Sequence, residues 1–85
     1  MSWFVYMVRC GDGSLYTGCT NDLVRRLKAH QSGRGAKYTR SRPPVTLVYR
    51  EELPNRSAAL RREAAVKRLT HLQKLALIEE RGEAT

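Results

Sequence analysis

The sequence predicts an α+β fold, and three observations support this prediction. Two runs rich in β-forming residues, 3–8 and 15–19, flank the turn Gly11-Asp12-Gly13, which is typical of a β-hairpin over residues 3–19. A third such run, 45–51, follows two prolines, which do not fit inside a sheet. Helical patterns occupy 21–31, 57–69 and 71–81. At 85 residues, we expect one domain, 1–85, with a single small core.

The charge of the chain indicates a polyanionic partner. Sixteen lysines and arginines outnumber eight acidic residues, for a net charge of +8. Nucleic acid fits this charge first and an anionic membrane surface second, while a basic surface that only confers solubility is the third possibility. No apolar run suits a transmembrane helix, and the first strand follows too soon for a signal peptide. We therefore expect a cytoplasmic protein without a membrane partner.

Cysteine and histidine usage gives no sign of a disulfide or a zinc site. Cys10 and Cys19 are expected to be free thiols in the cytoplasm. The spacing of the cysteines and the two histidines does not resemble a set of zinc ligands. A monomer is the default expectation.

The predicted hairpin carries one tyrosine on each strand, Tyr6 and Tyr16. Side chains alternate between the faces of a strand, so a three-residue turn places both phenols on one face. A two-residue turn would remove that alignment, and half-buried packing is the ordinary role of such tyrosines. Gly18, in the second strand, indicates a bulge or the close approach of a ligand or another backbone.

The helix predicted at 21–31 carries Arg26 and His30 four residues apart. N-capping residues precede this helix, and Leu23 and Leu27 form its apolar stripe. Residues four apart on a helix are neighbours, so the arginine and the histidine can reach the same place. Two solvated polar side chains are the plain alternative.

Residues 32–44 are predicted to form a basic loop rich in glycine and proline. Its cations suit phosphate groups, and Tyr38 suits stacking on a base. A flexible, solvated connection is the alternative. The cations are Arg34, Lys37, Arg40 and Arg42.

Glu63 falls inside the apolar arc of the helix predicted at 57–69, which runs from Val66 and Ala59 round to Leu60. A carboxylate that faces a core needs a partner, a metal or a catalytic task, because burying it unpaired is costly. An ion pair with Lys67, four residues later, is the alternative.

The helix predicted at 71–81 is expected to close the core and to carry no chemistry. Thr70-His71-Leu72-Gln73 has the pattern of a capping box. The apolar residues at helical spacing are Leu72, Leu75, Ala76 and Ile78.

Together these residue types suit the hydrolysis of a phosphodiester. One carboxylate can hold a hydrated divalent ion such as Mg²⁺. An arginine can neutralise a phosphate, and a phenol or an imidazole can handle the proton of an attacking water.

On these residues the chain resembles the GIY-YIG nuclease superfamily, and more closely its small stand-alone bacterial members. Phe4-Val5-Tyr6 stands in the place of the first triplet and Tyr16-Thr17-Gly18 in the place of the second. Segment 33–39 looks like one that is typical of the stand-alone subgroup. The remaining matches, in chain order, are Arg26, His30 and Glu63.

The resemblance implies a three-stranded antiparallel sheet flanked by about three helices. It also implies one-metal hydrolysis that leaves a 5′-phosphate and a 3′-hydroxyl. Glu63 would hold Mg²⁺ or Mn²⁺, Tyr6 or His30 would orient or deprotonate the water, and Arg26 and Tyr16 would bind the scissile phosphate. The implied catalytic residues are thus Tyr6, Tyr16, Arg26, His30 and Glu63, and the predicted nucleic-acid-binding residues are Gly18, Arg25, Arg34, Lys37, Tyr38, Arg40 and Lys67.

Two departures from the family pattern bear on activity. Phe4 stands where the first triplet has glycine, and Leu75 and Ile78 stand in the region where many active members have a supporting asparagine. The leading hypothesis is an endonuclease that recognises the structure of DNA, in preference to RNA, in processing or repair. A non-catalytic nucleic-acid-binding module is the second, and a protein-interaction module with a buried Arg26–Glu63 pair is the third.

Overall fold

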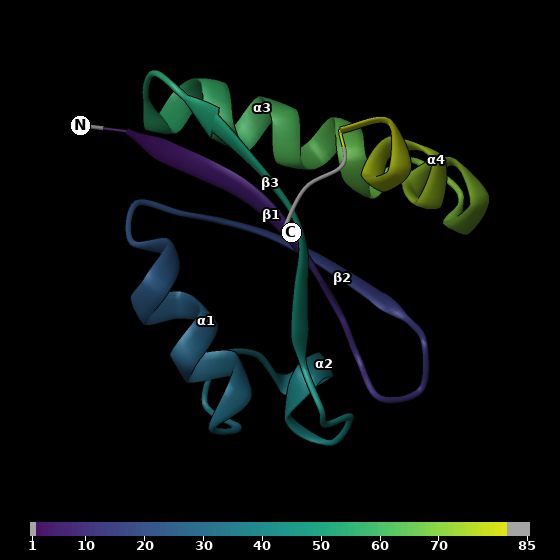
Figure 1. The fold of residues 1–85 in the computed structure, drawn as a ribbon. Coiled ribbons are helices and arrows are strands. Elements are labelled where there is room, and N and C mark those ends of the chain that lie inside the picture. Colours follow the sequence, from purple (N-terminus) through teal and green to yellow (C-terminus); the bar gives the residue numbers. More distant parts are fainter. Residues whose placement is uncertain (1, 82–85) are drawn as a thin grey trace.

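The computed structural model describes residues 2–81, which form a three-stranded antiparallel sheet and four helices (Figure 1). The order of the strands in the sheet is β2-β1-β3. This arrangement confirms the predicted α+β fold. The strands are β1 (Trp3–Arg9), β2 (Leu15–Thr20) and β3 (Thr46–Leu53), and the helices are α1 (Leu23–Gln31), α2 (Lys37–Arg40), α3 (Arg56–Lys67) and α4 (His71–Arg81).

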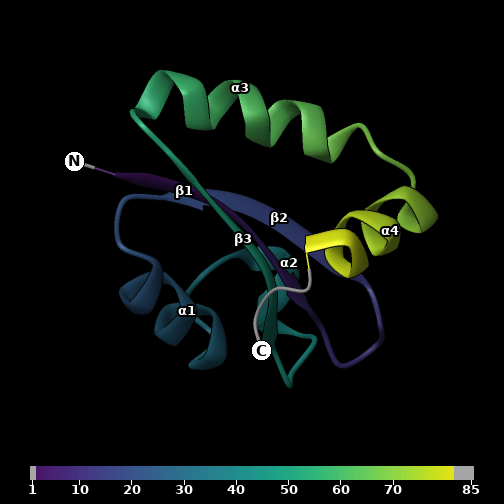
Figure 2. The same cartoon turned by 45° about the horizontal axis from the view of Figure 1, so that its top comes forward.

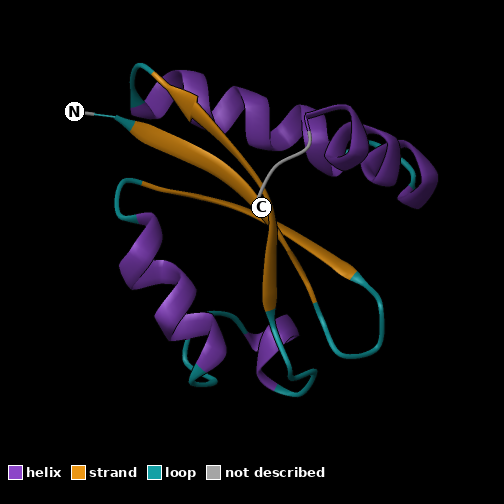
Figure 3. Ribbon diagram, viewed as in Figure 1, coloured by secondary structure: helices purple, strands orange, loops and turns teal. Residues whose placement is uncertain are grey.

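Helices cover both faces of the sheet. Helices α3 and α4 lie on one side and α1 and α2 on the other (Figure 2), and the strands separate the two pairs (Figure 3). Strand β1 lies in the middle, so residues on both of its faces are buried, as its continuous apolar run predicts. Val5 and Met7 pack in the core on the α3 side, and Tyr6 and Val8 pack in the core on the α1 side.

Several element boundaries differ from those expected from the sequence. Strand β3 extends to Leu53 rather than 51, and α3 ends at Lys67 rather than 69. Within the segment expected to be a loop, 32–44, residues Lys37–Arg40 form the short helix α2. Four residues are too few to show a helical repeat in the sequence, and this stretch is mostly polar.

The buried faces of α3 and α4 agree only in part with the predicted apolar stripes. In α3, Ala59 and Val66 of the predicted arc are fully buried, whereas Leu60 at its other side is 42% exposed. In α4, Ile78 of the predicted stripe packs against the core together with Leu77, which lies outside that stripe, whereas Leu72 is 76% exposed. The fit between the helix and the sheet decides which face is buried, and a small residue at the contact lets the two backbones approach.

The helix caps agree with the sequence patterns. At the start of α1, Asp22 Oδ1 accepts a hydrogen bond from the Arg25 N–H at 3.1 Å. Before α4, the Thr70 N–H donates to Gln73 Oε1 at 2.9 Å, and the Gln73 N–H donates to Thr70 Oγ1 at 3.1 Å. This pair of bonds confirms the predicted capping box.

Two expectations from composition also have structural counterparts. Cys10 and Cys19 are both free thiols. Within residues 2–81, no helix combines the length and the apolar character needed to cross a bilayer.

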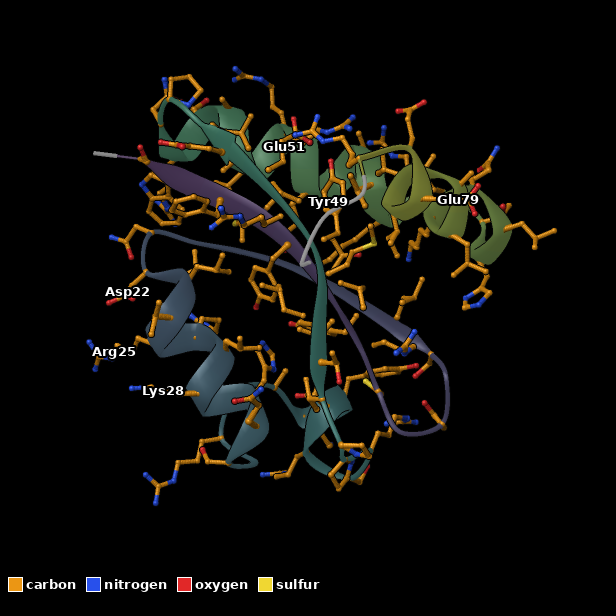
Figure 4. The ribbon with its side chains drawn as sticks, viewed as in Figure 1. Asp22, Arg25, Lys28, Tyr49, Glu51 and Glu79 are labelled. Atoms are coloured by element: carbon orange, nitrogen blue, oxygen red, sulfur yellow. The ribbon has the colours of Figure 1, made fainter. Side chains whose placement is uncertain are left out.

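A buried tyrosine and two charged residues tie β3 to α3. Tyr49 is fully buried, and its O–H donates to Glu51 Oε1 at 2.6 Å (Figure 4). Arg62 Nε donates to the same oxygen at 2.9 Å. Burial alone would raise the pKa of Glu51, but the hydrogen bonds from Tyr49 and Arg62 hold it below its usual value. The carboxylate therefore stays ionised between the strand and the helix.

Replacing Tyr49 with phenylalanine is expected to lower the free energy of unfolding by about 1.5 kcal/mol, because a half-buried carboxylate loses one of its donors. Urea denaturation measures this change. Tyr38→Phe, at a tyrosine that is 39% exposed, is the control and should alter stability little. Equal effects of the two substitutions would show that the Tyr49–Glu51 bond adds nothing.

Candidate active site

The two tyrosines of the hairpin lie on one face of the sheet. Tyr6 is paired across the strands with Gly18, and Val8 is paired with Tyr16. Directly opposite residues share a face, as do residues two apart in one strand. Both phenols therefore belong to the side covered by α1, where they pack near Leu23 and Leu27, and the predicted shared face is confirmed.

Gly18 makes room for the ring of Tyr6. A Cβ atom at Gly18 would lie 2.5 Å from the Tyr6 hydroxyl oxygen. Gly18 is itself buried, and the close approach that the sequence predicts at this glycine is made by the side chain of Tyr6. The glycine therefore positions the phenol of Tyr6, which is only 2% exposed.

His30, near the end of α1, links that phenol to α2. Its side chain is 1% exposed, and its two ring nitrogens have different partners. Nε2 lies 2.8 Å from the Tyr6 hydroxyl, and Nδ1 lies 2.8 Å from Thr39 Oγ1. Gly35 passes so close that a Cβ atom there would lie 2.3 Å from Nδ1. The imidazole is thus fixed from three elements, β1, α1 and α2.

Burial shifts the pKa values of both groups toward their neutral forms. The pKa of Tyr6 is raised well above its ordinary value by burial first and by Tyr16 second, with a smaller contribution from Glu63 and an opposing one from Arg26. The pKa of His30 is lowered, by burial first and then by the charge of Arg26. At neutral pH the pair therefore consists of a phenol and an uncharged imidazole.

A row of aromatic rings continues from His30 to the surface. The ring of Tyr16 lies 5.3 Å from that of His30 and 6.0 Å from that of Tyr38, between centroids. The guanidinium of Arg42 lies 4.0 Å from the centroid of the Tyr38 ring, and its Nε donates to Asp12 in the hairpin turn at 3.1 Å. This row places Tyr16 between the buried Tyr6–His30 pair and the basic segment 32–44.

Arg26 brings a positive charge to the same region. Its side chain is exposed, and its charge acts on the pKa of both Tyr6 and His30. It borders a hollow of about 280 Å³ at the start of α1, whose lining also includes Arg25. Arg25 points away from the sheet, on the outer side of α1 (Figure 4).

Glu63 contacts strand β2 from the opposite side of the sheet. The Cys19 thiol donates to Glu63 Oε1 at 3.4 Å, and Lys67 Nζ lies 3.2 Å from Glu63 Oε2. The ion pair with Lys67, the plain alternative from the sequence, is therefore present. A buried Arg26–Glu63 pair is not, because Arg26 is exposed and Lys67 holds the carboxylate.

Glu63 is the candidate metal ligand among the described residues. Among residues 2–81, no three histidine, cysteine or acidic side chains gather as a metal cluster. Glu63 has a side chain that is 17% exposed, and its lysine partner is 52% exposed. This donor set fits a hard divalent ion that keeps most of its waters and takes further oxygens from a phosphate.

The predicted nucleic-acid contacts fall on several surfaces. Lys37, Tyr38 and Arg40 line an open hollow of about 480 Å³ together with Ser41 and Arg42. Arg34 is exposed in the turn after α1, and Lys67 borders Glu63 on α3.

The sequence does not predict the site roles of four residues. Arg42 is one of the cations of the basic loop, but its contact with Tyr38 depends on the fold. Thr39 and Gly35 belong to the segment 33–39 that resembles the stand-alone subgroup, but the sequence assigns neither of them a contact with His30. Cys19 is predicted to be a free thiol, and nothing in the sequence pairs it with Glu63.

Comparison with known proteins agrees with the geometry. The model of the GIY-YIG catalytic domain family matches residues 2–76 of the chain. A UPF0213 protein of Streptococcus sanguinis is 58% identical over 78 residues, which are 92% of this chain and 90% of that protein. One from Staphylococcus haemolyticus is 50% identical over 78 residues, which are 92% of this chain and 95% of that protein.

Solved structures give the same result. The solution NMR structure of the UPF0213 protein from Bacillus halodurans is 45% identical, with a TM-score of 0.64 over 99% of this chain and 89% of that one. A protein of E. faecalis solved by the same method is 40% identical, with a TM-score of 0.63 over 100% of this chain and 92% of that one.

The chain therefore belongs to the GIY-YIG catalytic domain family, whose domain is of the nuclease type. Within that family it is similar to the small UPF0213 proteins of bacteria, of which it spans most of the length. The resemblance inferred from the two triplets is thus confirmed.

The lowered pKa of His30 predicts a pH-dependent stability. Below its ordinary pKa of 6.5, the unfolded chain binds a proton that the folded chain resists. The free energy of unfolding should therefore fall as the pH decreases below 6.5 and level off above it. Urea denaturation over about pH 5 to 8 measures the slope. His30→Gln should flatten it, whereas His71→Gln, at an exposed site, should keep it. Equal slopes in the two variants would contradict this assignment.

Gly35→Ala is expected to destabilise the fold by about 1–3 kcal/mol, because the added methyl group overlaps the His30 ring and forces it to move. Urea denaturation measures the loss. Ala76→Ser, which adds one atom at an exposed position of α4, is the control. A Gly35→Ala variant as stable as this control would show that the segment adjusts freely.

Proposed function

We propose that this chain hydrolyses phosphodiester bonds of nucleic acid at the edge of β2. The observation that carries the proposal is the 2.8 Å contact between the Tyr6 hydroxyl and His30 Nε2, and the charges of Arg26 and Glu63 both act on the pKa of that hydroxyl. A tyrosine that only packs in the core does not need a neutral imidazole bonded to its hydroxyl. It also does not need a positive and a negative residue that both act on the pKa of that hydroxyl.

The shifted pKa values favour His30 as the proton acceptor, with Tyr6 as the relay. Burial and then Tyr16 raise the pKa of Tyr6 and disfavour its phenolate, so the tyrosine is not a preformed base. As the water oxygen bonds to phosphorus, the Tyr6 oxygen takes a proton from the water, and the proton of Tyr6 passes to His30 Nε2. The bond from phosphorus to the 3′ oxygen breaks, and that oxygen takes a proton from solvent.

Arg26 and Tyr16 are proposed to bind the scissile phosphate. Arg26 is exposed beside the relay, and a guanidinium matches two phosphate oxygens at once. The ring of Tyr16 is held by His30 and Tyr38 on either side in the aromatic row, so its hydroxyl has a defined position. Fixed donors of this kind stabilise developing charge without reorganisation.

Glu63 is proposed to hold Mg²⁺ or Mn²⁺. Its half-exposed partner Lys67 can swing into solvent and leave the carboxylate free. When bound, a divalent ion neutralises charge on the phosphate and the leaving oxygen. The Cys19 thiol keeps Glu63 oriented through its contact with Oε1, and the pKa of that thiol is raised by burial and then by Glu63.

The substrate is proposed to be DNA that is recognised by its structure, as in processing or repair. Backbone contacts by cations carry no sequence information. The hollow beside Tyr16 offers Lys37 and Arg40 for phosphates and Tyr38 for a base. Arg25, Arg34 and Lys67 extend the contact surface.

Glu63→Gln is expected to reduce cleavage by about 100-fold or more, since metal stabilisation of several kcal/mol would be lost. Labelled single-stranded, duplex and branched DNA, and RNA, are incubated with Mg²⁺ or with EDTA. Glu79→Gln, at an exposed glutamate of α4, is the matched control and should cut like the unmodified protein (Figure 4). Cleavage that survives both Glu63→Gln and EDTA would contradict the assignment.

A non-catalytic nucleic-acid-binding module is the second candidate. The Glu63–Lys67 ion pair favours it, because a neutralised carboxylate needs no metal. If the protein and its Glu63→Gln variant leave every substrate intact but bind it equally, this candidate stands. Binding through the basic surface should then weaken steeply as salt rises.

A further inference from the structure

Thr39 completes the set of groups around His30. It comes from α2, and it is 1% exposed. Its hydroxyl oxygen lies 2.8 Å from His30 Nδ1 and 3.2 Å from the carbonyl oxygen of Ala36. The carbonyl can only accept, so the hydroxyl can donate to it.

The three side chains share three hydrogens: one on the Tyr6 hydroxyl, one on the neutral imidazole and one on the Thr39 hydroxyl. One arrangement gives each of them an acceptor. Thr39 donates to Ala36 O, His30 Nδ1–H donates to Thr39 Oγ1, and Tyr6 donates to His30 Nε2.

The reverse arrangement leaves one donor without a partner. If Thr39 donated to Nδ1, the ring hydrogen would sit on Nε2 and would point at the Tyr6 oxygen. The hydrogen of Tyr6 would then need another acceptor. The described residues offer its hydroxyl no hydrogen-bond partner besides His30, and Tyr6 is only 2% exposed. A buried donor without an acceptor costs about 1–3 kcal/mol, so the first arrangement is favoured.

We propose that Thr39 is a positioning residue that keeps the hydrogen of His30 on Nδ1 and leaves Nε2 free to accept the proton of Tyr6. Which nitrogen of a histidine is protonated is set by the hydrogen bond that the other one makes. The catalytic meaning of this tautomer rests on the proposed function, but the tautomer itself can be measured without any substrate.

Two further features support this role. Gly35 lets the chain pass against the ring, where a Cβ atom would lie 2.3 Å from Nδ1, so Thr39 can reach that nitrogen from α2. Burial and the charge of Arg26 keep the imidazole neutral by lowering its pKa, so that one nitrogen is free to act as a base.

The ¹⁵N chemical shifts of the imidazole nitrogens test the proposal directly. In the unmodified protein we expect His30 Nδ1 to be protonated and Nε2 to be bare. His71, the other histidine, is exposed on α4 and serves as the internal reference. A His30 protonated at Nε2 would overturn the proposal.

Thr39→Val and Thr39→Ser separate the hydroxyl from the shape of the side chain. Valine keeps the volume but removes the acceptor, so the His30 population should move toward protonated Nε2. Serine keeps the hydroxyl and should preserve the original pattern. If valine also preserved it, Thr39 would be a packing residue, and the proposal would fail. If valine does not fold, the tautomer in the unmodified and serine proteins still decides the question.

Cleavage assays add the catalytic consequence. Thr39→Val should lower kcat on the order of 10- to 100-fold with little change in KM, which is part of the contribution of a general base. Thr39→Ser should restore most of it. An absence of cleavage by the unmodified protein would defeat the proposed function, whereas the ¹⁵N shifts would still show whether Thr39 sets the tautomer.

Discussion

The buried hydrogen bonds of His30 are the interaction on which the site depends. The imidazole joins Tyr6 of β1 to Thr39 of α2, and it is carried by α1. A neutral imidazole buried among apolar groups needs a partner for each nitrogen, because an unpaired polar atom is costly there. The segments that meet at this ring are therefore held in place by the same bonds that define the chemistry of the tyrosine.

Neighbouring residues of β2 connect the two faces of the sheet. Tyr6 packs against Gly18 on the face covered by α1, and Glu63 contacts the thiol of Cys19 on the face covered by α3. Strand β2 is an edge strand of the sheet, so only one strand separates these groups. Glu63 can thus influence the pKa of Tyr6 although the two belong to different layers.

Membership of the GIY-YIG family gives this geometry a chemical context. Gly18 makes room for Tyr6, and Gly35 makes room for His30. The Tyr6–His30 pair that these glycines allow to form is the centre of the proposed site. The Glu63–Lys67 ion pair is the point at which a nuclease and a binding module would differ. A lysine that leaves the carboxylate permits metal binding, and one that stays prevents it.

The sequence alone determined the features that depend on local geometry. Strand alternation placed both phenols on one face, spacing along α1 placed Arg26 beside His30, and the capping box at Thr70 formed as its pattern requires. Only the tertiary structure decided where each buried helix face ends, as the burial of Ala59 beside the exposed Leu60 shows, and which residue would meet His30 Nδ1. The reason is physical: alternation and capping involve neighbours in the chain, whereas the position of Thr39 depends on how a short polar helix packs against a distant one.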